Sequence, residues 1–328
     1  MSKKKVSKIG VLTSGGDAPG MNAAIRAVVR TGLHHGLEVF GIMRGYSGMV
    51  DNDIVPMNSR SVANIIQRGG TILKTARCKE FFEPEGRAIA YENLKKLGID
   101  GLVIIGGDGS FRGAQKFSNE FDIPCIGIPG TIDKDMAGTD YTIGFDTAVN
   151  TAVEAIDKIR DTMDAHDRLF IVEVMGRDAG YIALHSGIAT GAENILIPET
   201  KTDAEALINS LTEKGKRKKL VNLIVVAEGD GFGGANELAK LIKERLPWAD
   251  TRVCILGHIQ RGGSPTCEDR LVASHMGYYA VESLLIGRHN VMVGLVNKKI
   301  HYTPLDSAIK LTQPIGLEWM KIVKILAS

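Results

Sequence analysis

Short runs of apolar residues recur along the chain, and glycine or polar residues bound each run. Most of the runs do not alternate apolar with polar positions, which is typical of strands buried on both faces of a parallel sheet. The runs that we interpret as strands cover residues 8–13, 38–43, 101–105, 124–128, 169–174, 195–197, 221–227 and 252–256.

Segments with helical spacing of apolar residues separate these strands. The predicted helices cover residues 21–35, 87–97, 147–163, 179–190, 204–214, 235–245 and 269–285. Alternation of strands and helices predicts an α/β fold with helices on both faces of mostly parallel sheets. In such folds ligands bind at the carboxyl ends of the strands, where loops lead into helices.

Length, charge and cysteine content restrict the class of protein. At about 150 residues per domain, 328 residues indicate two domains. The 40 Lys and Arg residues against 38 Asp and Glu residues leave a net charge of +2, so nucleic acid is not an expected partner. Without an apolar run of about 18 residues, no membrane association is expected. Cys78, Cys125, Cys254 and Cys267 form no CxxC pair, which favours reduced thiols in a cytoplasmic protein and disfavours zinc.

Glycine is abundant, with 38 residues, and the first glycine-rich loop follows the first predicted strand. Backbone N–H groups of residues 13–20 can surround a phosphate. Gly15 and Gly20 have the spacing of a Walker loop, but Met21 stands where that loop has lysine, so a loop of that type is excluded. A tight strand-to-helix turn is the alternative interpretation.

Two further loops combine glycine with aspartate. Asp108 lies beside glycines at a helix start, where it can bind Mg²⁺ while backbone amides hold phosphates; alternatively, it is only a helix N-cap. Asp133 and Asp135 are two residues apart in a loop, so one can act as a base while the other lies near a metal. The alternative is a pair of turn-forming aspartates.

A fourth loop, residues 257–264, contains an imidazole, an amide and a guanidinium within four residues. His258, Gln260 and Arg261 together suit a polyol that carries a phosphate, because the arginine fork matches phosphate oxygens.

Two other patterns in the sequence, a GxGxxG segment and a basic run, do not by themselves indicate a ligand. Residues 229–234 fit GxGxxG, and Asp250 follows about 20 residues later. A dinucleotide site needs that acid at the end of the next strand, whereas Asp250 precedes it, so an NAD site is excluded. The basic run at residues 214–219 is interpreted as a solvated helix end.

Six motifs in order, spread over nearly the whole chain, resemble the bacterial type of ATP-dependent 6-phosphofructokinase. They are IGVLTSGGDAPGMN (9–22), GGDGS (106–110), PGTID (129–133), GTDYTIGF (138–145), VEVMGR (172–177) and LGHIQRGGSP (256–265). The resemblance implies phosphorylation of fructose 6-phosphate by Mg·ATP, the committed step of glycolysis. It also implies two Rossmann-like three-layer domains and a homotetramer with active sites shared between subunits. The ATP-binding domain would be residues 1–144 plus 259–310, and the fructose 6-phosphate domain residues 145–258 plus 311–328.

The resemblance also implies residue roles. Asp133 would be the general base, with Thr131 and Arg177 stabilising the transferred phosphoryl group, and Asp108 and Asp135 would bind Mg²⁺. ATP would contact Gly16, Arg77, Cys78, Asp108, Gly109, Ser110 and Gly113. The sugar phosphate would contact Thr131, Asp133, Arg168, Met175, Gly176, Arg177, Glu228, Arg252, His258 and Arg261. Of these, Arg168 and Arg252 would come from a neighbouring subunit.

A regulatory site for a nucleotide diphosphate is a further implication, with ADP and phosphoenolpyruvate as effectors. It would comprise Arg26, Arg30, Ser59, Arg60, Arg160, Gly191, Glu193, Lys214, Lys216 and Lys218. An arginine that the family places at Ser59 stands at Arg60 here, and the basic run is longer than in the family.

Related pyrophosphate-dependent enzymes carry Asp and Lys where this chain has Gly109 and Gly130, so ATP is the expected donor. The alternatives are pyrophosphate as donor, a non-catalytic regulatory subunit that would lack the loop aspartates, and another phosphosugar such as tagatose 6-phosphate or sedoheptulose 7-phosphate. Lys134 replaces the family's usual Asn between Asp133 and Asp135, and we expect its side chain to point to solvent.

Overall fold

The computed structural model describes residues 6–165, 168–216, 222–309, 315–316 and 318–326. The chain divides into two compact units. The first comprises Met1–Thr147 and Arg261–Gln313, and the second comprises Ala148–Gln260 and Pro314–Ser328. These boundaries differ by two or three residues from the expected domain limits, and the ligand of each unit remains a prediction.

The first unit contains a seven-stranded sheet in the order β11-β10-β5-β4-β1-β2-β3. Its interior strands run parallel, whereas β3 and β11 at the two edges are antiparallel to their neighbours. The strands are β1 (Lys8–Thr13), β2 (Glu38–Ile42), β3 (Ile54–Met57), β4 (Gly101–Gly106), β5 (Cys125–Pro129), β10 (Val291–Val296) and β11 (Lys299–Pro304).

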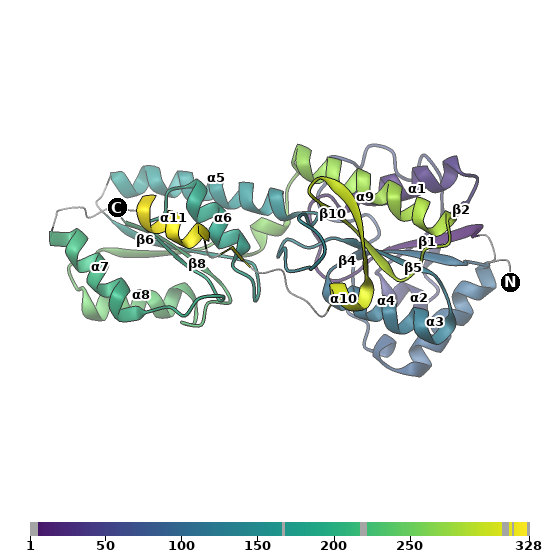
Figure 1. The fold of residues 1–328 in the computed structure, drawn as a ribbon, viewed down its shortest axis with the longest axis horizontal. Helices are drawn as coiled ribbons and strands as arrows, with labels where there is room; N and C mark the ends of the chain where they lie inside the picture. The colour runs from purple at the N-terminus through teal and green to yellow at the C-terminus, as the bar shows by residue number, and fades with distance from the viewer. Residues whose placement is uncertain (1–5, 166–167, 217–221, 310–314, 317, 327–328) are drawn as a thin grey trace. The chain divides into compact units, whose positions relative to one another are not determined.

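Helices cover both faces of this sheet, as Figure 1 shows. On one face, α1 (Met21–His34) packs along α9 (Cys267–Leu285). The other face is covered by α2 (Tyr46–Val50), α3 (Pro84–Leu97), α4 (Asp108–Phe121) and α10 (Leu305–Ala308), with the short 3₁₀ helix η1 (Glu80–Phe82) beside them. Phe111 and Phe117 of α4 are fully buried in the core on that second face.

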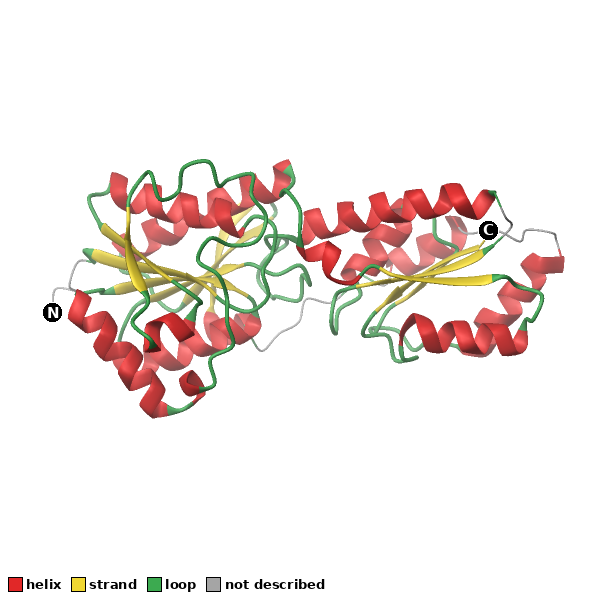
Figure 2. Ribbon diagram, turned by 180° about the vertical axis from the view of Figure 1, so that it is seen from behind, coloured by secondary structure: helices red, strands yellow, loops and turns green. Residues whose placement is uncertain are grey.

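The second unit contains a four-stranded parallel sheet in the order β7-β8-β6-β9. Its strands are β6 (Leu169–Val174), β7 (Asn194–Leu196), β8 (Asn222–Ala227) and β9 (Thr251–Ile255). Figure 2 shows the three layers of this unit. The helices are α5 (Phe145–Asp164), whose first turn belongs to the first unit, α6 (Tyr181–Ala189), α7 (Ala204–Lys216), α8 (Gly234–Arg245) and α11 (Glu318–Leu326), with η2 (Gly257–Arg261) following β9.

The expected α/β class with mostly parallel sheets is confirmed, and the differences are strands and helices that the pattern did not predict. The sequence pattern missed β3, β10 and β11, of which β11 alternates exposed and half-buried residues because it is an edge strand. A helix start was expected at Asp108, but the pattern did not give the extent of α4, whose sequence DGSFRGAQKFSNEF has few apolar residues. The helices α2, α10 and α11 were not predicted either.

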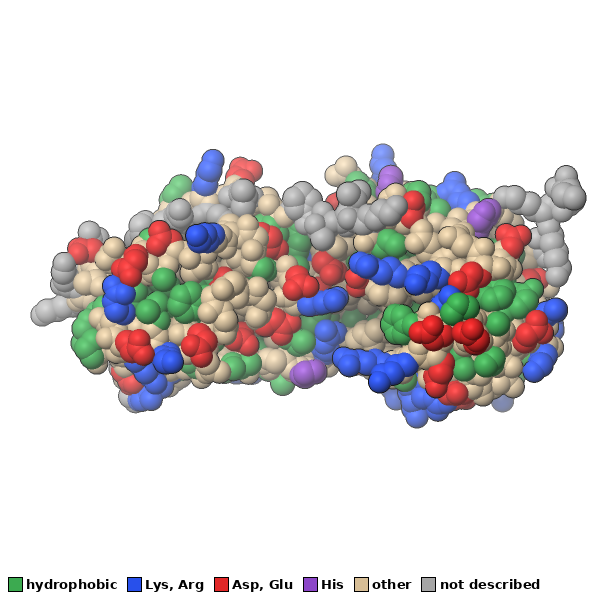
Figure 3. Space-filling view, turned by 90° about the horizontal axis from the view of Figure 1, so that it is seen from below, with side chains coloured by type: hydrophobic (Ala, Val, Ile, Leu, Met, Phe, Trp, Pro, Cys, Tyr) green, Lys and Arg blue, Asp and Glu red, His purple; other side chains and the backbone are tan. Residues whose placement is uncertain are grey.

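Figure 3 shows acidic and basic side chains interspersed over the face that it displays. Among the described residues, no helix combines the length and apolar character that crossing a membrane requires.

Candidate active site

Three of the predicted glycine-rich loops meet at the carboxyl ends of the parallel strands of the seven-stranded sheet. They follow β1, β4 and β5, which are adjacent and parallel, so their carboxyl ends lie side by side. The backbone N–H of Ser14 donates to Ile105 O at 3.0 Å, and that of Gly130 donates to Gly106 O at 3.0 Å. Backbone hydrogen bonds therefore tie the loops after β1 and β5 to the end of β4, from which the third loop starts.

The loop after β4 leads directly into α4. Gly107 has an extended backbone and is the N-cap, so Asp108 is the first helical residue and is not the N-cap. The backbone N–H groups of the first turn point away from the helix and suit an anion. A Cβ atom at Gly109 would have nothing within 4 Å, whereas one at Gly106 would overlap Ser110 Oγ and Ser14 O. Gly106 allows the loops to approach, and Gly109 leaves space at the helix start.

Asp133 and Thr131 lie in the loop after β5 and are 7% and 8% exposed. The backbone N–H of Asp133 donates to Thr131 Oγ1 at 3.2 Å. A Cβ atom at Gly107 would lie 3.7 Å from Thr131 Cβ, so this loop adjoins the start of α4. Asp135 is half-buried. The loop that carries Thr131 and Asp133 therefore lies against the end of α4 that suits phosphate groups.

Contrary to the expectation from the sequence, the Lys134 side chain does not point into solvent. Its Nζ lies 4.7 Å from the centre of the Phe145 ring, at the start of α5, which is a cation–π distance. The Lys134 side chain is half-buried, and this burial lowers the pKa of its amino group. Its φ of 56° is in the left-handed region that few residues other than Gly, Asn and Asp adopt.

Arg261 lies against the loop after β1. A Cβ atom at Gly16 would overlap the Arg261 guanidinium, and Arg261 Nη1 donates to Asp17 O at 3.2 Å. Arg261 belongs to the first unit. An arginine that the resemblance assigned to the sugar phosphate therefore covers the loop that it assigned to ATP.

Asn22, near the start of α1, is a positioning residue that sequence reasoning missed. Its Nδ2 donates to Arg68 O at 3.0 Å and to Gly69 O at 3.1 Å, and its Oδ1 accepts from Ile72 N at 2.8 Å. Asn22 thereby fixes the segment that leads to Arg77. The signal in the sequence is a polar residue on the apolar face of a helix, and Asn22 is 1% exposed.

The remaining predicted ATP contacts differ in accessibility. Arg77 is exposed, but the Cys78 side chain is buried in the hydrophobic core, where burial raises the pKa of its thiol. Cys78 therefore offers a nucleotide only its backbone. One side of Gly113 is covered by the Tyr46 ring, which a Cβ atom would approach to 2.9 Å, and the Tyr46 hydroxyl donates to Ser110 O.

The donor set suits Mg²⁺ delivered with a nucleotide. Mg²⁺ prefers one or two carboxylates together with substrate phosphates and water. Asp108 and Asp135 supply such carboxylates on adjoining loops, and Asp108 Oδ2 lies 3.3 Å from Arg112 Nη2. Within the described part of the chain, no cluster of three or more His, Cys, Asp or Glu side chains could hold a metal by itself.

In the second unit, one group of predicted residues lies at the carboxyl edge of the four-stranded sheet. Glu228 Oε1 accepts from Arg177 N at 2.7 Å and from Gly176 N at 3.3 Å. Arg177, like Lys134, has a left-handed φ of 56°. The Glu228 carboxylate thus fixes the backbone of the loop after β6, and the Arg177 side chain is 61% exposed.

The fourth predicted loop lies beside this group. His258 is exposed. Gln260, expected to contact a ligand, is fully buried: its Oε1 accepts from Met175 N at 3.3 Å, and its Nε2 donates to Gly257 O at 3.1 Å. That expectation was wrong, because the Gln260 amide joins two loops of the protein.

Arg168 and Arg252 lie at the opposite, amino edge of this sheet. Arg168 precedes β6, and Arg252 is the second residue of β9. Arg168 Nε lies 2.8 Å from Asp250 Oδ2, and Arg252 Nη2 lies 3.0 Å from Asp250 Oδ1. β6 has six residues at about 3.3 Å each, so these arginines are roughly 20 Å from Met175.

The predicted regulatory residues fall in both units. Arg160 Nη1 donates to Thr190 O and, at 3.2 Å, to Gly191 O, and Glu193 Oε2 accepts from Leu223 N at 2.7 Å. In the first unit, Arg26 and Arg30 are one turn apart on α1, and burial followed by the Arg30 charge lowers the pKa of Arg26. Of the others, Ser59 and Arg60 are exposed, Lys214 and Lys216 end α7 with side chains outside the described residues, and Lys218 lies outside them entirely.

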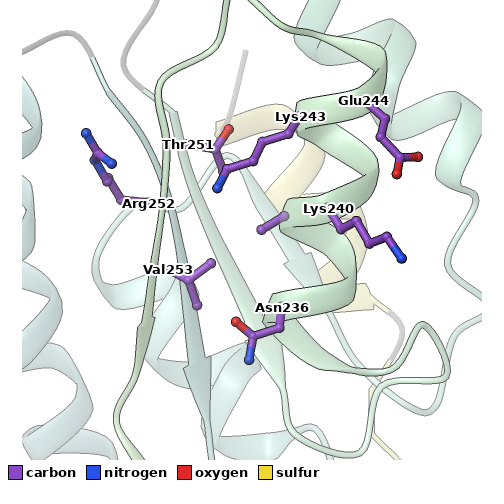
Figure 4. Close-up of a pocket in the computed structure, with 8 residues that line it drawn as sticks. Asn236, Lys240, Lys243, Glu244, Thr251, Arg252 and Val253 are labelled. Atoms are coloured by element: carbon purple, nitrogen blue, oxygen red, sulfur yellow. The ribbon is translucent and has the colours of Figure 1, made fainter.

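A pocket of about 500 Å³ lies between α8 and β9. Figure 4 shows Lys243 extending toward Thr251, whereas Lys240 points away from the strand and Arg252 leaves β9 on the side away from α8. The lining residues are Asn236, Ala239, Lys240, Lys243, Glu244, Thr251, Arg252 and Val253. The basic side chains do not converge on one point in this pocket.

Fold and loops together define an α/β protein that presents backbone amides and carboxylates for phosphate groups. A family model described as phosphofructokinase matches residues 8–284. The chain belongs to the phosphofructokinase family.

Curated relatives match over nearly their whole length. An ATP-dependent 6-phosphofructokinase 2 of Bacteroides thetaiotaomicron is 54% identical over 322 residues, which cover 98% of this chain and 99% of the relative. An ATP-dependent 6-phosphofructokinase of a Thermoanaerobacter species is 56% identical over 319 residues, with 97% and 99% covered.

Solved structures agree in fold. Phosphofructokinase from Saccharomyces cerevisiae superposes with a TM-score of 0.88 at 38% identity over 98% of this chain, which spans only 48% of the yeast chain. A pyrophosphate-dependent phosphofructokinase from Marinobacter aquaeolei has a TM-score of 0.84 at 24% identity, covering 95% of this chain and 86% of that one. The second likeness shows the fold alone.

Proposed function

We propose that this chain transfers the γ-phosphoryl group of Mg·ATP to the 1-hydroxyl of fructose 6-phosphate, giving fructose 1,6-bisphosphate and ADP. The observation that supports this proposal most directly is that the loops after β1 and β5 both bond to the end of β4, and that buried Asp133 belongs to the loop that adjoins the start of α4. The 54–56% identity to enzymes named ATP-dependent 6-phosphofructokinase supports the substrates.

In this reaction Asp133 accepts the proton of the sugar 1-hydroxyl. The oxygen of that hydroxyl bonds to the γ-phosphorus while the bond from the γ-phosphorus to the β–γ bridging oxygen breaks, leaving ADP. Phosphoryl transfer depends mainly on positioning and charge neutralisation. Thr131 and Arg177 are assigned to the transferred group, and the first turn of α4 to the nucleotide phosphates.

Mg²⁺ bound with the nucleotide would neutralise phosphate charge. Asp108 and Asp135 are the residues that we assign to it, since carboxylates on adjoining loops match its preference for oxygen ligands. The other proposed ATP contacts are Gly16, Arg77, Gly109, Ser110 and Gly113, and the backbone of Cys78.

The sugar phosphate is assigned to the second unit and to Arg261. Met175, Gly176, Arg177, Glu228 and His258 come from its carboxyl edge. Arg168 and Arg252 at the amino edge are too far from Met175 for one hexose phosphate to reach both groups. This separation supports the proposal that these two arginines bind the 6-phosphate in a second copy, within a homotetramer.

Regulation by ADP and phosphoenolpyruvate is part of the proposal. The Arg160 contacts around Gly191 and the adjacent Glu193 support a site in the second unit.

The test is a phosphorylation assay of fructose 6-phosphate with Mg·ATP and, separately, with Mg·pyrophosphate. Activity with ATP alone is expected. Activity with pyrophosphate would contradict the role given to Gly109, which leaves open space at the start of α4. Absence of activity with both donors would contradict the proposed function and would indicate another phosphosugar substrate or a regulatory subunit.

A further inference from the structure

Asp250 has no role in the function proposed so far, although it lies between Arg168 and Arg252, which both have one. β6 and β9 pair in parallel with Leu169 opposite Thr251, and Leu169 N donates to Asp250 O at 3.1 Å. This register brings the residue before β6 next to the residue before β9. Arg168 and Asp250 are those two residues.

The Asp250 carboxylate contacts both arginines. Oδ2 accepts from Arg168 Nε at 2.8 Å and from Arg252 Nη2 at 3.2 Å, and Oδ1 lies 3.0 Å from that same Nη2. A guanidinium has five N–H donors. Arg168 uses its Nε on Asp250, and Arg252 uses one terminal nitrogen, so both retain donors for an incoming anion.

Charge explains why an acid is needed between these arginines. Two neighbouring guanidinium groups repel each other, and the carboxylate between them reduces that repulsion while leaving a net positive charge. The Arg168 hydrogen bond, followed by the charges of both arginines, lowers the pKa of Asp250, so the carboxylate is ionised at neutral pH.

The three side chains remain accessible to a ligand. Exposed fractions are 27% for Arg168, 51% for Arg252 and 47% for Asp250. Ion pairs this exposed contribute little to stability. An effect of Asp250 on binding can therefore be measured separately from an effect on folding.

We propose that Asp250 is a positioning residue that holds Arg168 and Arg252 side by side as one receptor for the 6-phosphate of the sugar. The inference rests on the proposed function. It assigns to Asp250 no contact with the substrate: the residue acts by fixing two long side chains that would otherwise lose rotamer freedom on binding.

The test compares Asp250→Ala, Asp250→Asn and Asp250→Glu with the unmodified chain in steady-state assays and thermal melts. Asp250→Ala is expected to raise the KM for fructose 6-phosphate on the order of tenfold, because two arginine side chains must then be ordered on binding. The KM for ATP should stay within about twofold, kcat should change less than the sugar KM, and Asp250→Glu should restore part of the loss.

The chain supplies a matched control. Arg245 on α8 pairs with Glu205 on α7 through two contacts of 2.8 Å, in the same unit and with comparable exposure. Glu205→Ala removes an exposed ion pair that has no part in the proposed site. It should leave both KM values unchanged.

The outcomes separate the inference from the function on which it rests. If the unmodified chain does not phosphorylate fructose 6-phosphate, the proposed function fails. If it does, an unchanged KM for fructose 6-phosphate in Asp250→Ala would mean that Asp250 has no role in binding. A lowered KM would mean that Asp250 competes with the phosphate. Either result would show that the inference is wrong. If Asp250→Ala has a lowered melting temperature, the KM for fructose 6-phosphate of the near-isosteric Asp250→Asn is used for the same comparison.

Discussion

The two units position their candidate ligand-binding residues differently. In the seven-stranded unit, loops from three adjacent strands lie at one edge and are joined by hydrogen bonds of Ser14 and Gly130. In the four-stranded unit, the loop around Gly176 and the pair Arg168–Arg252 lie at opposite edges. Under the proposed function, one chain forms the nucleotide part of a site by itself, whereas Arg168 and Arg252 would complete the sugar-phosphate part from a second copy.

The largest effect is expected at the base in the seven-stranded unit. Asp133→Asn should lower kcat by about 10²–10⁴-fold, the usual contribution of a general base. The KM values should change far less. Asp122→Asn, an exposed aspartate with a left-handed φ of 53°, is the control and should be fully active. Retention of more than a tenth of the activity by Asp133→Asn would assign the base elsewhere.

The two glycines at the donor site should respond differently to substitution. Gly109→Asp meets open space, so the melting temperature should not change, but its carboxylate would oppose the nucleotide phosphates and lower kcat/KM for ATP by roughly 10²-fold. Gly130→Lys should lower the melting temperature, because a Cβ there lies 3.0 Å from Ile105 Cγ2 and 3.1 Å from Met21 Cε. Full ATP activity in the double variant would contradict the donor argument.

The proposed sharing of active sites between copies can be tested with mixed oligomers. Asp133→Asn keeps the arginines and Arg168→Ala keeps the base, so each variant alone should be nearly inactive. Co-expressed in equal amounts, they should recover up to about a quarter of the activity, since that share of shared sites combines both intact parts. Absence of recovery, with mixing verified by two affinity tags, would mean that each site belongs to a single chain.

The smallest effect concerns Lys134. Lys134→Asn should change the free energy of unfolding by less than about 1 kcal/mol, because Asn tolerates a left-handed φ and offsets the lost cation–π contact. Lys134→Met loses that contact without relieving the backbone and should destabilise by about 1 kcal/mol. Urea titrations measure both. Equal stability of Lys134→Met and the unmodified chain would show that the Phe145 contact adds nothing.

Much of the fold is predictable because buried parallel strands are continuous apolar runs. The pattern placed β1 and β6 at their observed residues, and the glycine-rich loops at the edge where three strands end. The helix start at Asp108 was expected, but the extent of α4 was not, because its buried face consists of few residues such as Phe111 and Phe117.

The errors at the site arise where tertiary contacts determine the position of a side chain. Gln260 has the residue type of a ligand contact but is buried between two loops, and the Lys134 amino group lies over the Phe145 ring. The sequence singles out Asp250 only as the acid of a GxGxxG pattern, because the register that places it between Arg168 and Arg252 is not visible in the sequence.

The matching left-handed conformations of Lys134 and Arg177 bear on attempts to make this enzyme heat-resistant. Both have φ 56°, one in each of the loops assigned to phosphoryl transfer. Selection for stability alone would favour glycine or asparagine at such positions, since these residues adopt the conformation at lower cost. At Arg177 the replacement would remove a cation assigned to the reaction. Screens for thermal resistance should therefore exclude this position, or score turnover together with melting.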